Sequence, residues 1–426
     1  MSGAVAEDLS RICGAAHVRD GEPYRIADRT PALGVRPGSD EEVSRVLAFA
    51  DAQRMAVVPW GKGVQQTLLA SPARYDIALD LGRLDRFLAY EPGDMTATVQ
   101  AGMPLAALQQ VLAGHGQCFP LDPPWADTAT VGGAVASLQA GPLRCQYGSA
   151  RDLVLGVQVA HADGTITKAG SRVVKNATAY DVTKLYVGSF GTLAVLLSMT
   201  LRLHPRPAAE RGFMVSGGAL DALHGFAVQL LGSHLAPSRI ELLTAGTACG
   251  LSTTEPVIVL SFGGVPEAVA DQAETLGRFA GQSRFPVMET AQDAFTRVRD
   301  FPGAATETTA CWRGGVLASD GGKALEAMRA ALPPSVWFAG ALTVSHGTIR
   351  GICQTQDREA LAPALGAARD AIENMGGYLV VSDGPAWLRT GMDVWGTPPA
   401  EIDILRSLKH TFDPNGVLNP GRFLGL

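Results

Sequence analysis

The chain lacks the cysteine patterns of common metal centres. None of its cysteines forms a Cys-x-x-Cys pair, which is the usual spacing in structural zinc sites and in iron–sulfur proteins. We therefore predict no metal site in this chain. Thiols scattered in this way are expected to be reduced and buried. The six cysteines are Cys13, Cys118, Cys145, Cys249, Cys311 and Cys353.

Clustered positive charge and long apolar runs are also missing. The net charge is −6 and no block of Lys or Arg occurs, so we expect no nucleic-acid partner. The first residues, MSGAVAEDLSRICGAA, carry acids where a signal peptide needs basic residues. The nearest candidate for a membrane-spanning helix, residues 193–199, is far shorter than the ~18 residues required. We expect a cytoplasmic protein without an integral membrane segment, peripheral at the inner membrane only through partners.

What the chain does have is length and a high content of small and hydrophobic residues. Hydrophobic residues make up 46% of its 426 residues, which is a globular composition, and the length predicts two domains. Residues 1–35 resemble an irregular lead-in. Ser39, followed by Glu42, predicts the start of an amphipathic helix, and Pro104 predicts the start of a second one. Strands are expected at 56–58, 77–81, 95–101, 153–160, 165–168 and 193–203, before a boundary at 204–207.

Beyond residue 213, strand-like and helix-like segments alternate. Their loose β-α-β-β order predicts an antiparallel sheet backed by helices. Strands are expected at 213–216, 239–243, 257–262, 312–317, 336–342, 348–353 and 378–382. Helices are expected at 219–232, 266–280, 322–332, 358–375 and 399–412.

Two glycine-rich stretches, residues 59–66 and 119–152, are the main candidates for a binding site. Without a Cβ, glycine lets backbone N–H groups approach a flat or anionic ligand. A Rossmann site is not expected, because Pro72 would break the helix that must follow Gly61 and Gly63. Two separated loops suit a ligand long enough to reach both, such as a dinucleotide. Taken alone, the pattern is equally compatible with two ordinary turns of an α+β domain.

Five sequence blocks occur in an order that resembles the vanillyl-alcohol-oxidase, or p-cresol-methylhydroxylase-type, flavoproteins. They are PGSDEEV (37–43), VVPWGKG (57–63), DPPWADTATVGGAVA (122–136), GSARDLVLGV (148–157) and GSFGTLAV (188–195). The terminal DPNGVLNPGRF (413–423) resembles the family's last segment, which returns to the flavin domain. Within the family, the short chain, a lysine-asparagine turn in 174–182 and the Trp-Arg pair at 312–313 are most similar to the FAD-binding subunit of glycolate oxidase (glycolate dehydrogenase) complexes.

This resemblance implies an α+β fold and FAD as the cofactor. A two-subdomain p-cresol-methylhydroxylase-type FAD-binding domain (30–206) would follow a lead-in (1–29). A ferredoxin-like cap domain (207–398) of antiparallel strands and helices comes next, and the C-terminal segment (399–426) returns to the FAD domain. Val64 stands where covalently flavinylated members carry His, so the FAD is expected to be non-covalent.

The resemblance also implies where the parts of FAD bind. The pyrophosphate is expected on 59–66 and 130–133, the adenine near 191–195, and the isoalloxazine near Ser137, Gly141, Pro142 and Asn419. The implied contacts are Pro59, Trp60, Gly61, Lys62, Gly63, Val64, Gln65, Gln66, Leu121, Asp122, Pro123, Thr130, Val131, Gly132, Gly133, Ala136, Ser137, Gly141, Pro142, Gly191, Thr192, Val195 and Asn419. Three positions depart from the family pattern: Trp60 replaces Arg or another small-loop residue, and Lys62 and Ala194 replace glycines.

Catalytic residues are less evident than cofactor contacts. The family chemistry, hydride transfer from the α-carbon of a 2-hydroxy acid to the flavin, needs a base for the hydroxyl proton and cations for the carboxylate. The candidates are Arg313, His346, Arg350 and Tyr378. Each also has a structural interpretation, because the arginines flank strands, the histidine lies at a strand turn and the tyrosine suits a core.

The resemblance implies an FAD-binding oxidoreductase subunit of a glycolate (2-hydroxy acid) dehydrogenase complex. Its partners would be a flavin-bearing catalytic subunit and an iron–sulfur subunit that receives the electrons. Two alternatives remain open at this stage. One is a self-sufficient flavin oxidase or dehydrogenase of an alcohol or D-2-hydroxy acid, and the other is a degenerate flavin domain that serves as a scaffold.

Overall fold

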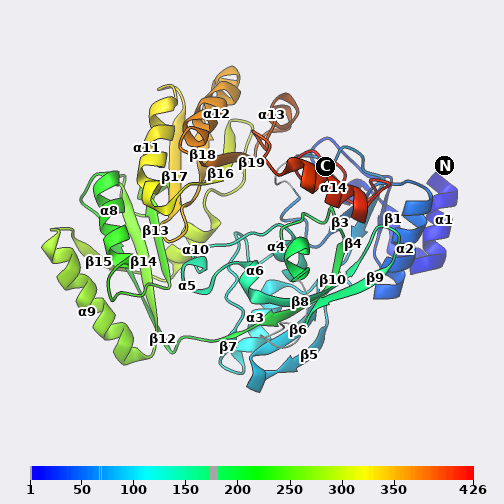
Figure 1. Cartoon of the computed structure of the whole chain (residues 1–426), viewed down its shortest axis with the longest axis horizontal. Helices are drawn as coiled ribbons and strands as arrows, with labels where there is room; N and C mark the ends of the chain where they lie inside the picture. Colours follow the sequence, from blue (N-terminus) through cyan, green and yellow to red (C-terminus); the bar gives the residue numbers. More distant parts are fainter. Residues whose placement is uncertain (1, 67, 69, 172–180) are drawn as a thin grey trace. The chain divides into compact units, whose positions relative to one another are not determined.

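The computed structural model of the chain describes residues 2–66, 68, 70–171 and 181–426 (Figure 1). It contains two compact units. Unit 1 comprises Met1–Ala140, Ser149–Arg206 and Pro398–Leu426, and unit 2 comprises Gly141–Gly148 and Pro207–Thr397. Within the range 30–206, therefore, the short segment Gly141–Gly148 groups with the second unit. The turn expected at 174–182 falls, except for Asp181 and Val182, outside the described residues.

The N-terminal part of unit 1 is a four-stranded sheet with two helices. The strand order is β1 (Val18–Asp20), β2 (Leu33–Val35), β4 (Ile77–Asp80) and β3 (Val57–Trp60). Only the β1–β2 pair is antiparallel; β4 runs parallel to both of its neighbours. Helix α2 (Asp40–Ala52) begins as predicted, with Ser39 Oγ accepting a hydrogen bond from the Glu42 N–H at 3.2 Å.

The irregular lead-in predicted for residues 1–35 is wrong. Helix α1 (Ser2–Cys13) and strands β1 and β2 occupy much of it. Leu9 is fully buried in the core of unit 1, and Val5 and Ile12 pack against the same core. These three residues have helical spacing, and their burial stabilises a helix that contains a glycine and two serines.

The other sheet of unit 1 is five-stranded and antiparallel. Its order is β5 (Phe87–Glu91), β6 (Thr96–Gln100), β10 (Val195–Arg202), β8 (Val154–Ala160) and β9 (Ile166–Gly170). The central strand β10 is buried along almost its whole length, as its continuous apolar sequence predicts. Helix α3 (Leu105–Ala113) and a small ribbon of β7 (Gln117–Cys118) with β11 (His204–Pro205) complete this part.

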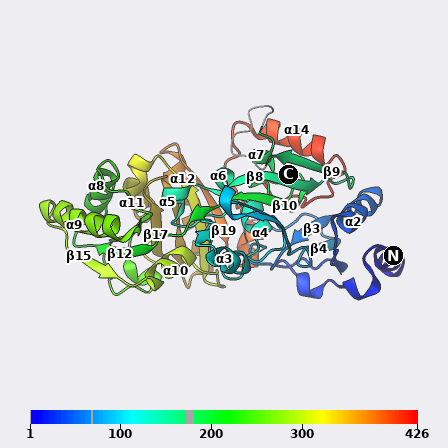
Figure 2. The same cartoon turned by 90° about the horizontal axis from the view of Figure 1, so that it is seen from below.

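The C-terminal helix α14 (Ile402–Phe412) also belongs to unit 1. Figure 2 shows it beside the sheet that contains β8 and β9. The Phe412 ring at its end stacks on His161, with 5.7 Å between the ring centroids. The following tail reaches the other sheet of the unit, where Leu418 forms a bridge with Val57 of β3. The C-terminal segment, for which the resemblance implies a return to the FAD domain, therefore groups with unit 1.

Unit 2 is built on one eight-stranded sheet whose neighbouring strands all pair antiparallel. The order is β15 (Val287–Thr290), β12 (Ala209–Val215), β14 (Val257–Gly264), β13 (Arg239–Leu243), β17 (Trp337–Thr343), β18 (Thr348–Gln354), β16 (Thr309–Gly315) and β19 (Tyr378–Asp383). Its longer helices are α8 (Leu220–Leu231), α9 (Pro266–Gln282), α10 (Asp293–Asp300), α11 (Gly321–Ala331), α12 (Arg358–Glu373) and α13 (Ala386–Gly391).

The two faces of this sheet are covered differently. Helices α8, α11 and α12 lie along one face (Figure 1), where Leu342 of β17 contacts α11 at Gly321. The preceding residue, Ala341, points to the other face and packs in a core with Phe295 and Val298 of α10. The sequence did not predict α10 or the edge strand β15, because both are short and carry exposed residues. The predicted antiparallel sheet backed by helices is confirmed.

The expectation that every thiol is buried is only partly confirmed. All six cysteines are free, and four are buried, whereas Cys118 and Cys145 are partly exposed. Burial raises the pKa of Cys13 to about 12, and it also raises the pKa of Cys118 and Cys145. The Cys145 thiol contacts the Pro237 carbonyl oxygen at 3.4 Å within unit 2.

Candidate functional site

The first wall of the candidate site is the turn that follows β3. The Gln66 side chain donates to the Pro59 carbonyl oxygen at 2.7 Å and closes the turn. Gly63 has φ +78°, and a Cβ there would lie 2.6 Å from the Trp60 ring. Trp60 is held from behind, because its indole N–H donates to the Tyr75 hydroxyl at 2.5 Å. Trp60, which departs from the family pattern, is therefore a packed part of this wall.

The second wall is the start of the short helix α4 (Val131–Ala136). The sequence suggested a glycine loop here, but the backbone is the first turn of a helix whose N-cap, Thr130, accepts a hydrogen bond from the Gly133 N–H at 3.2 Å. A Cβ on Gly61 would lie 2.3 Å from Thr130 Oγ1, so the two glycine segments face each other closely.

The two glycines of α4 have different surroundings. A Cβ on Gly132 would come within 2.7 Å of the Ala101 carbonyl oxygen, to which the Gly132 N–H already donates at 2.9 Å. Gly132 therefore lets the helix approach its neighbouring strand. A Cβ on Gly133 would meet only Thr130 Oγ1, at 3.1 Å, and Gly133 lines an open cleft.

The third wall joins the segment before β10 to the C-terminal tail. Asn419 donates from its side-chain amide to the Phe190 carbonyl oxygen at 2.6 Å. Phe190, Gly191 and Asn419 all have positive φ, as expected for a tight approach of two irregular segments. The Arg422 guanidinium donates to the Gln66 carbonyl oxygen at 3.0 Å and so ties the tail to the first wall.

These walls enclose a cleft of about 790 Å³, counting its open mouth, entirely within unit 1. Most of the predicted FAD contacts line it. They are Pro59, Trp60, Gly61, Lys62, Gly63, Val64, Gln65, Gln66, Thr130, Gly132, Gly133, Ala136, Ser137, Gly191, Val195 and Asn419.

The polar atoms of the cleft suit an elongated, negatively charged ligand. Both side-chain amide atoms of Gln65 and the Oδ1 atom of Asn419 are buried and make no hydrogen bond within the protein. Leaving such atoms unsatisfied is costly, so they fit a ligand with donors and acceptors of its own. Arg422 is 4% exposed and brings a buried positive charge beside the first wall. Together with Gly133, these residues fit a dinucleotide and its diphosphate.

Seven predicted contacts do not line this cleft. Leu121 and Val131 are in the hydrophobic core, and Gly141 and Pro142 belong to unit 2. Thr192 uses its hydroxyl group to donate to the Ser189 carbonyl oxygen at 2.6 Å. The remaining two are Asp122 and Pro123. Their roles as FAD contacts stay predictions.

Seven further residues line the cleft and are absent from the predicted set. They are Leu81, Ala101, Ala129, Phe190, Ala194, Leu196 and Arg422. Phe190, Ala194 and Arg422 lie inside the recognised sequence blocks, which was an available signal. Ala129 also lies inside such a block, at 122–136, whereas Leu81 and Ala101 directly follow β4 and β6 and carry no local signal.

The four predicted catalytic candidates all lie in unit 2, at one end of its sheet. Arg313 of β16 is directly opposite Arg350 of β18, and Gly315 is opposite Tyr378 of β19, so these side chains share a face. Tyr378 is 60% exposed, so the alternative of core packing is wrong for it. His346 lies exposed in the turn between β17 and β18, where its ring nitrogen Nδ1 hydrogen bonds to Ser345 Oγ at 2.8 Å.

Arg350 binds two other elements of unit 2, β13 and α10. Arg350 pairs with Glu241 at 2.7 Å and also donates to the carbonyl oxygens of Val298 and Phe301, at 2.9 and 3.2 Å. It therefore holds the C-terminal end of α10 against the sheet. Burial lowers the pKa of Arg313, and nearby Tyr378 acts in the opposite direction.

Comparison with known proteins identifies an FAD-binding domain. Residues 31–170 match the family described as FAD binding domain. The fold is similar to p-cresol methylhydroxylase, with a TM-score of 0.78 at 15% identity over 99% of this chain and 96% of the other. Residues 31–170 of the chain carry an FAD-binding domain. This confirms the resemblance, the fold class and FAD as the cofactor.

Two relatives match nearly the whole chain of this FAD-binding protein. The glycolate oxidase subunit GlcD of Bacillus subtilis is 24% identical over 456 residues, covering 98% of this chain and 96% of the relative. A D-2-hydroxyglutarate dehydrogenase of Xanthomonas citri is 27% identical over 424 residues, covering 91% and 88%. The chain is an FAD-linked oxidoreductase.

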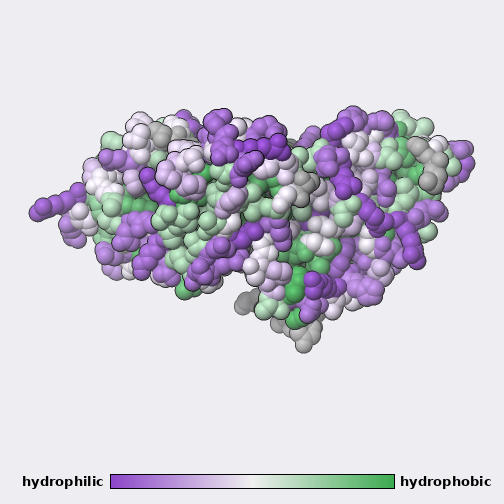
Figure 3. All heavy atoms as spheres, turned by 90° about the horizontal axis from the view of Figure 1, so that it is seen from above, coloured by the Kyte–Doolittle hydropathy of each residue, from purple (hydrophilic) through white to green (hydrophobic). Residues whose placement is uncertain are grey.

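From the sequence we expected neither a membrane-spanning segment nor a metal site. Among the helices in the described ranges, none is both long and apolar enough to cross a bilayer. Over the same part of the chain, no three His, Cys, Asp or Glu side chains are grouped so that they could hold a metal ion. Figure 3 shows hydrophilic and hydrophobic residues interspersed on the face that it draws.

Proposed function

We propose that this chain oxidises a small 2-hydroxy acid such as glycolate and passes the electrons from its non-covalent FAD to a separate iron–sulfur subunit. The observation that carries the proposal is the arginine-bearing face of the unit 2 sheet. A guanidinium group binds a carboxylate through two parallel hydrogen bonds. The relatives named above are named for glycolate and 2-hydroxyglutarate, which share a carboxylate next to a hydroxyl-bearing carbon.

On this face, Arg313 is the first choice for the substrate carboxylate. Arg313 lies on the same face as exposed Tyr378, whereas Arg350 pairs with Glu241 and holds α10, which gives Arg350 a role in the fold. Arg144, from the short helix α5 (Arg144–Tyr147), reaches the same face and donates to Thr348 Oγ1 at 3.4 Å. Arg144 and Arg313 would bind the carboxylate together, and exposed Tyr378 would border the substrate.

In unit 1, the cleft residues would hold the cofactor. When bound, FAD supplies the two-electron oxidant. Arg422 would face the diphosphate, and Gln65 and Asn419 would exchange hydrogen bonds with the polar edges of the ligand. The backbone at Gly61 and Gly133 would allow its close approach.

The cysteine pattern supports an electron acceptor outside this chain. No Cys-x-x-Cys pair is present in the sequence, and the six thiols are free. Electrons from the flavin would therefore leave to another protein rather than to a cluster held here. The name of the B. subtilis relative describes it as a subunit.

Anaerobic titration of the purified protein tests this function. We expect flavin absorbance that acid releases as FAD, and bleaching of that absorbance by glycolate or another 2-hydroxy acid. The reduced protein should be reoxidised slowly by oxygen and rapidly by the copurified iron–sulfur partner. Rapid reoxidation by oxygen alone would support a self-sufficient oxidase instead. A colourless protein that cannot be reconstituted with FAD would refute both enzymatic functions.

Replacing Arg313 by methionine should reduce kcat/KM for the 2-hydroxy acid by about 100-fold, mainly through KM, because a charged hydrogen-bonding partner of the carboxylate is lost. Steady-state kinetics with the partner or an artificial acceptor would measure this. Arg211→Met, which removes an exposed ion pair with Glu289 in the same unit, is the matched control. Unchanged kinetics in Arg313→Met would remove this residue from the substrate site.

A further inference from the structure

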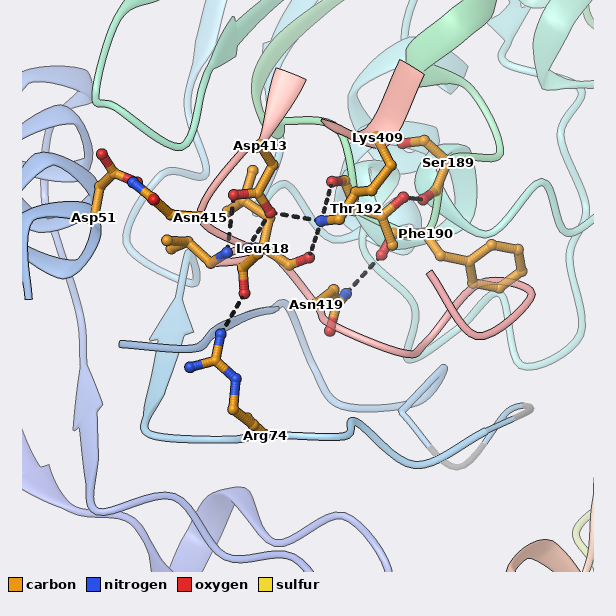
Figure 4. A network of polar contacts seen from close by, with 12 residues as sticks. Asp51, Arg74, Ser189, Phe190, Thr192, Lys409, Asp413, Asn415, Leu418 and Asn419 are labelled. Atoms are coloured by element: carbon orange, nitrogen blue, oxygen red, sulfur yellow. Dashed lines mark hydrogen bonds and ion pairs between the residues drawn. The ribbon is translucent and has the colours of Figure 1, made fainter. Parts of the chain in front are cut away.

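A buried lysine near the FAD cleft has no place in the function described so far. Lys409, in the last turn of α14, is 8% exposed. Its ammonium group donates to Asp413 Oδ2 at 2.5 Å, to the Thr192 carbonyl oxygen at 2.9 Å and to the Leu418 carbonyl oxygen at 2.8 Å (Figure 4). A lysine has three N–H donors, and all of them are used here. They join α14 to two other segments of unit 1.

The carboxylate partner holds the turn after the helix. Asp413 is 2% exposed and accepts hydrogen bonds from the backbone N–H groups of Val417 and Leu418, at 2.8 and 2.7 Å. The turn is further tied by Arg74, which donates to the Gly416 carbonyl oxygen at 2.8 Å. The backbone entering the tail is thus fixed by one buried carboxylate and its cation (Figure 4).

Lys409 and Asp413 bind two chain segments, and each segment has a residue that lines the cleft. Leu418 directly precedes Asn419, whose Oδ1 is buried in the cleft without a partner in the protein. Thr192 directly follows Gly191, which lines the same cleft beside Phe190. Lys409 therefore bridges the two backbones of the third wall, one residue away from the cleft in each.

Stability alone does not explain a charged pair at this place. Taking two charges out of water is costly, and apolar residues of similar volume often stabilise a core at least as well. Burial lowers the pKa of Lys409, while Asp413 counteracts the shift. What an apolar pair could not provide is a set of directed hydrogen bonds to two specific carbonyl oxygens. The pair is thus suited to fixing geometry.

We propose that Lys409 and Asp413 are positioning residues for FAD: by joining the Thr192 and Leu418 carbonyls, they set the orientation in which Asn419 presents its Oδ1 to the cofactor. This inference rests on the placement of FAD in the unit 1 cleft. It predicts that the ion pair acts on cofactor affinity through Asn419 rather than only through the stability of the fold.

A double-mutant cycle on the full chain tests the proposal. Lys409→Met, Asn419→Ala and the double variant are stripped of FAD, checked for folding by circular dichroism and thermal unfolding, and titrated with FAD by flavin fluorescence. Each single change should weaken FAD binding about tenfold or more, and the double variant should be no weaker than the weaker single. Lys409→Arg should recover part of the affinity. We expect the bound-flavin absorbance band to shift in the same direction in Lys409→Met and in Asn419→Ala.

The control is Arg406→Met on the same helix, which removes an exposed ion pair with Asp403 and should leave FAD affinity unchanged. Additive effects in the cycle, or wild-type affinity in folded Lys409→Met, would overturn the proposal. If both Lys409→Met and the milder Asp413→Asn unfold the apoprotein, the pair serves the fold and the proposal also fails. The Gly133→Leu variant tests separately whether FAD binds in the unit 1 cleft. If FAD binds elsewhere, this variant would retain FAD, and its Lys409 contacts would be intact.

Discussion

Replacing Gly133 by leucine is expected to abolish FAD retention while leaving the chain folded. Gly133 lines the cleft, and the only atom that its added Cβ would meet within 4 Å is Thr130 Oγ1, at 3.1 Å. The leucine side chain would therefore enter the space expected for the diphosphate instead of colliding with the backbone. Absorbance at the flavin bands of the purified protein, with protein concentration measured independently, gives the FAD content.

Two other glycines provide controls for this variant. Gly132→Leu should impair folding, because a Cβ there would lie 2.7 Å from the Ala101 carbonyl oxygen. Gly225 of α8 has nothing within 4 Å of its added Cβ, so Gly225→Leu should retain both fold and FAD. A normal FAD content in Gly133→Leu would refute the placement of the diphosphate at the start of α4.

Replacing Arg350 by methionine is expected to lower the free energy of unfolding by about 3–5 kcal/mol, because it leaves the Glu241 carboxylate buried without its cation. The side chains of Arg350 and Glu241 are 13% and 1% exposed. The variant also loses the hydrogen bonds that hold the end of α10 through Val298 and Phe301. Chemical denaturation followed by tryptophan fluorescence would measure the change.

Arg211→Met tests whether this effect depends on burial. The Arg211–Glu289 pair is 41% and 55% exposed, so its loss should change the unfolding free energy by no more than about 1 kcal/mol. If Arg350→Met is as stable as Arg211→Met but loses activity, Arg350 belongs to the substrate site instead of to the fold.

The two arginines of the unit 2 sheet show what cannot be predicted from the sequence. Arg313 and Arg350 both belong to predicted strands, and nothing local shows which of them pairs with a distant carboxylate. The difference arises because Glu241, Val298 and Phe301, which are distant in sequence, converge on Arg350 in the folded unit.

Much of the fold of both units could nevertheless be predicted from the sequence. The capped start of α2, the apolar strand β10 and the alternating elements of unit 2 follow from local patterns of hydrophobicity and from capping residues. The ordered glycine blocks were enough to predict the family and FAD. Local patterns did not predict α1 and α10, because the stability of these two helices depends on burial against the rest of the fold.

The amino-acid sequence by itself determined the class of protein, because five glycine-containing blocks and a terminal segment carry the backbone requirements of an FAD site. Only the tertiary structure decided which glycine serves the cleft and which serves packing, since that depends on whether Ala101 or open space lies opposite the Cβ position. It also brought Lys409 to the carbonyls of Thr192 and Leu418, and Arg422 to Gln66. Such contacts join residues far apart in the chain, so no local pattern can encode them.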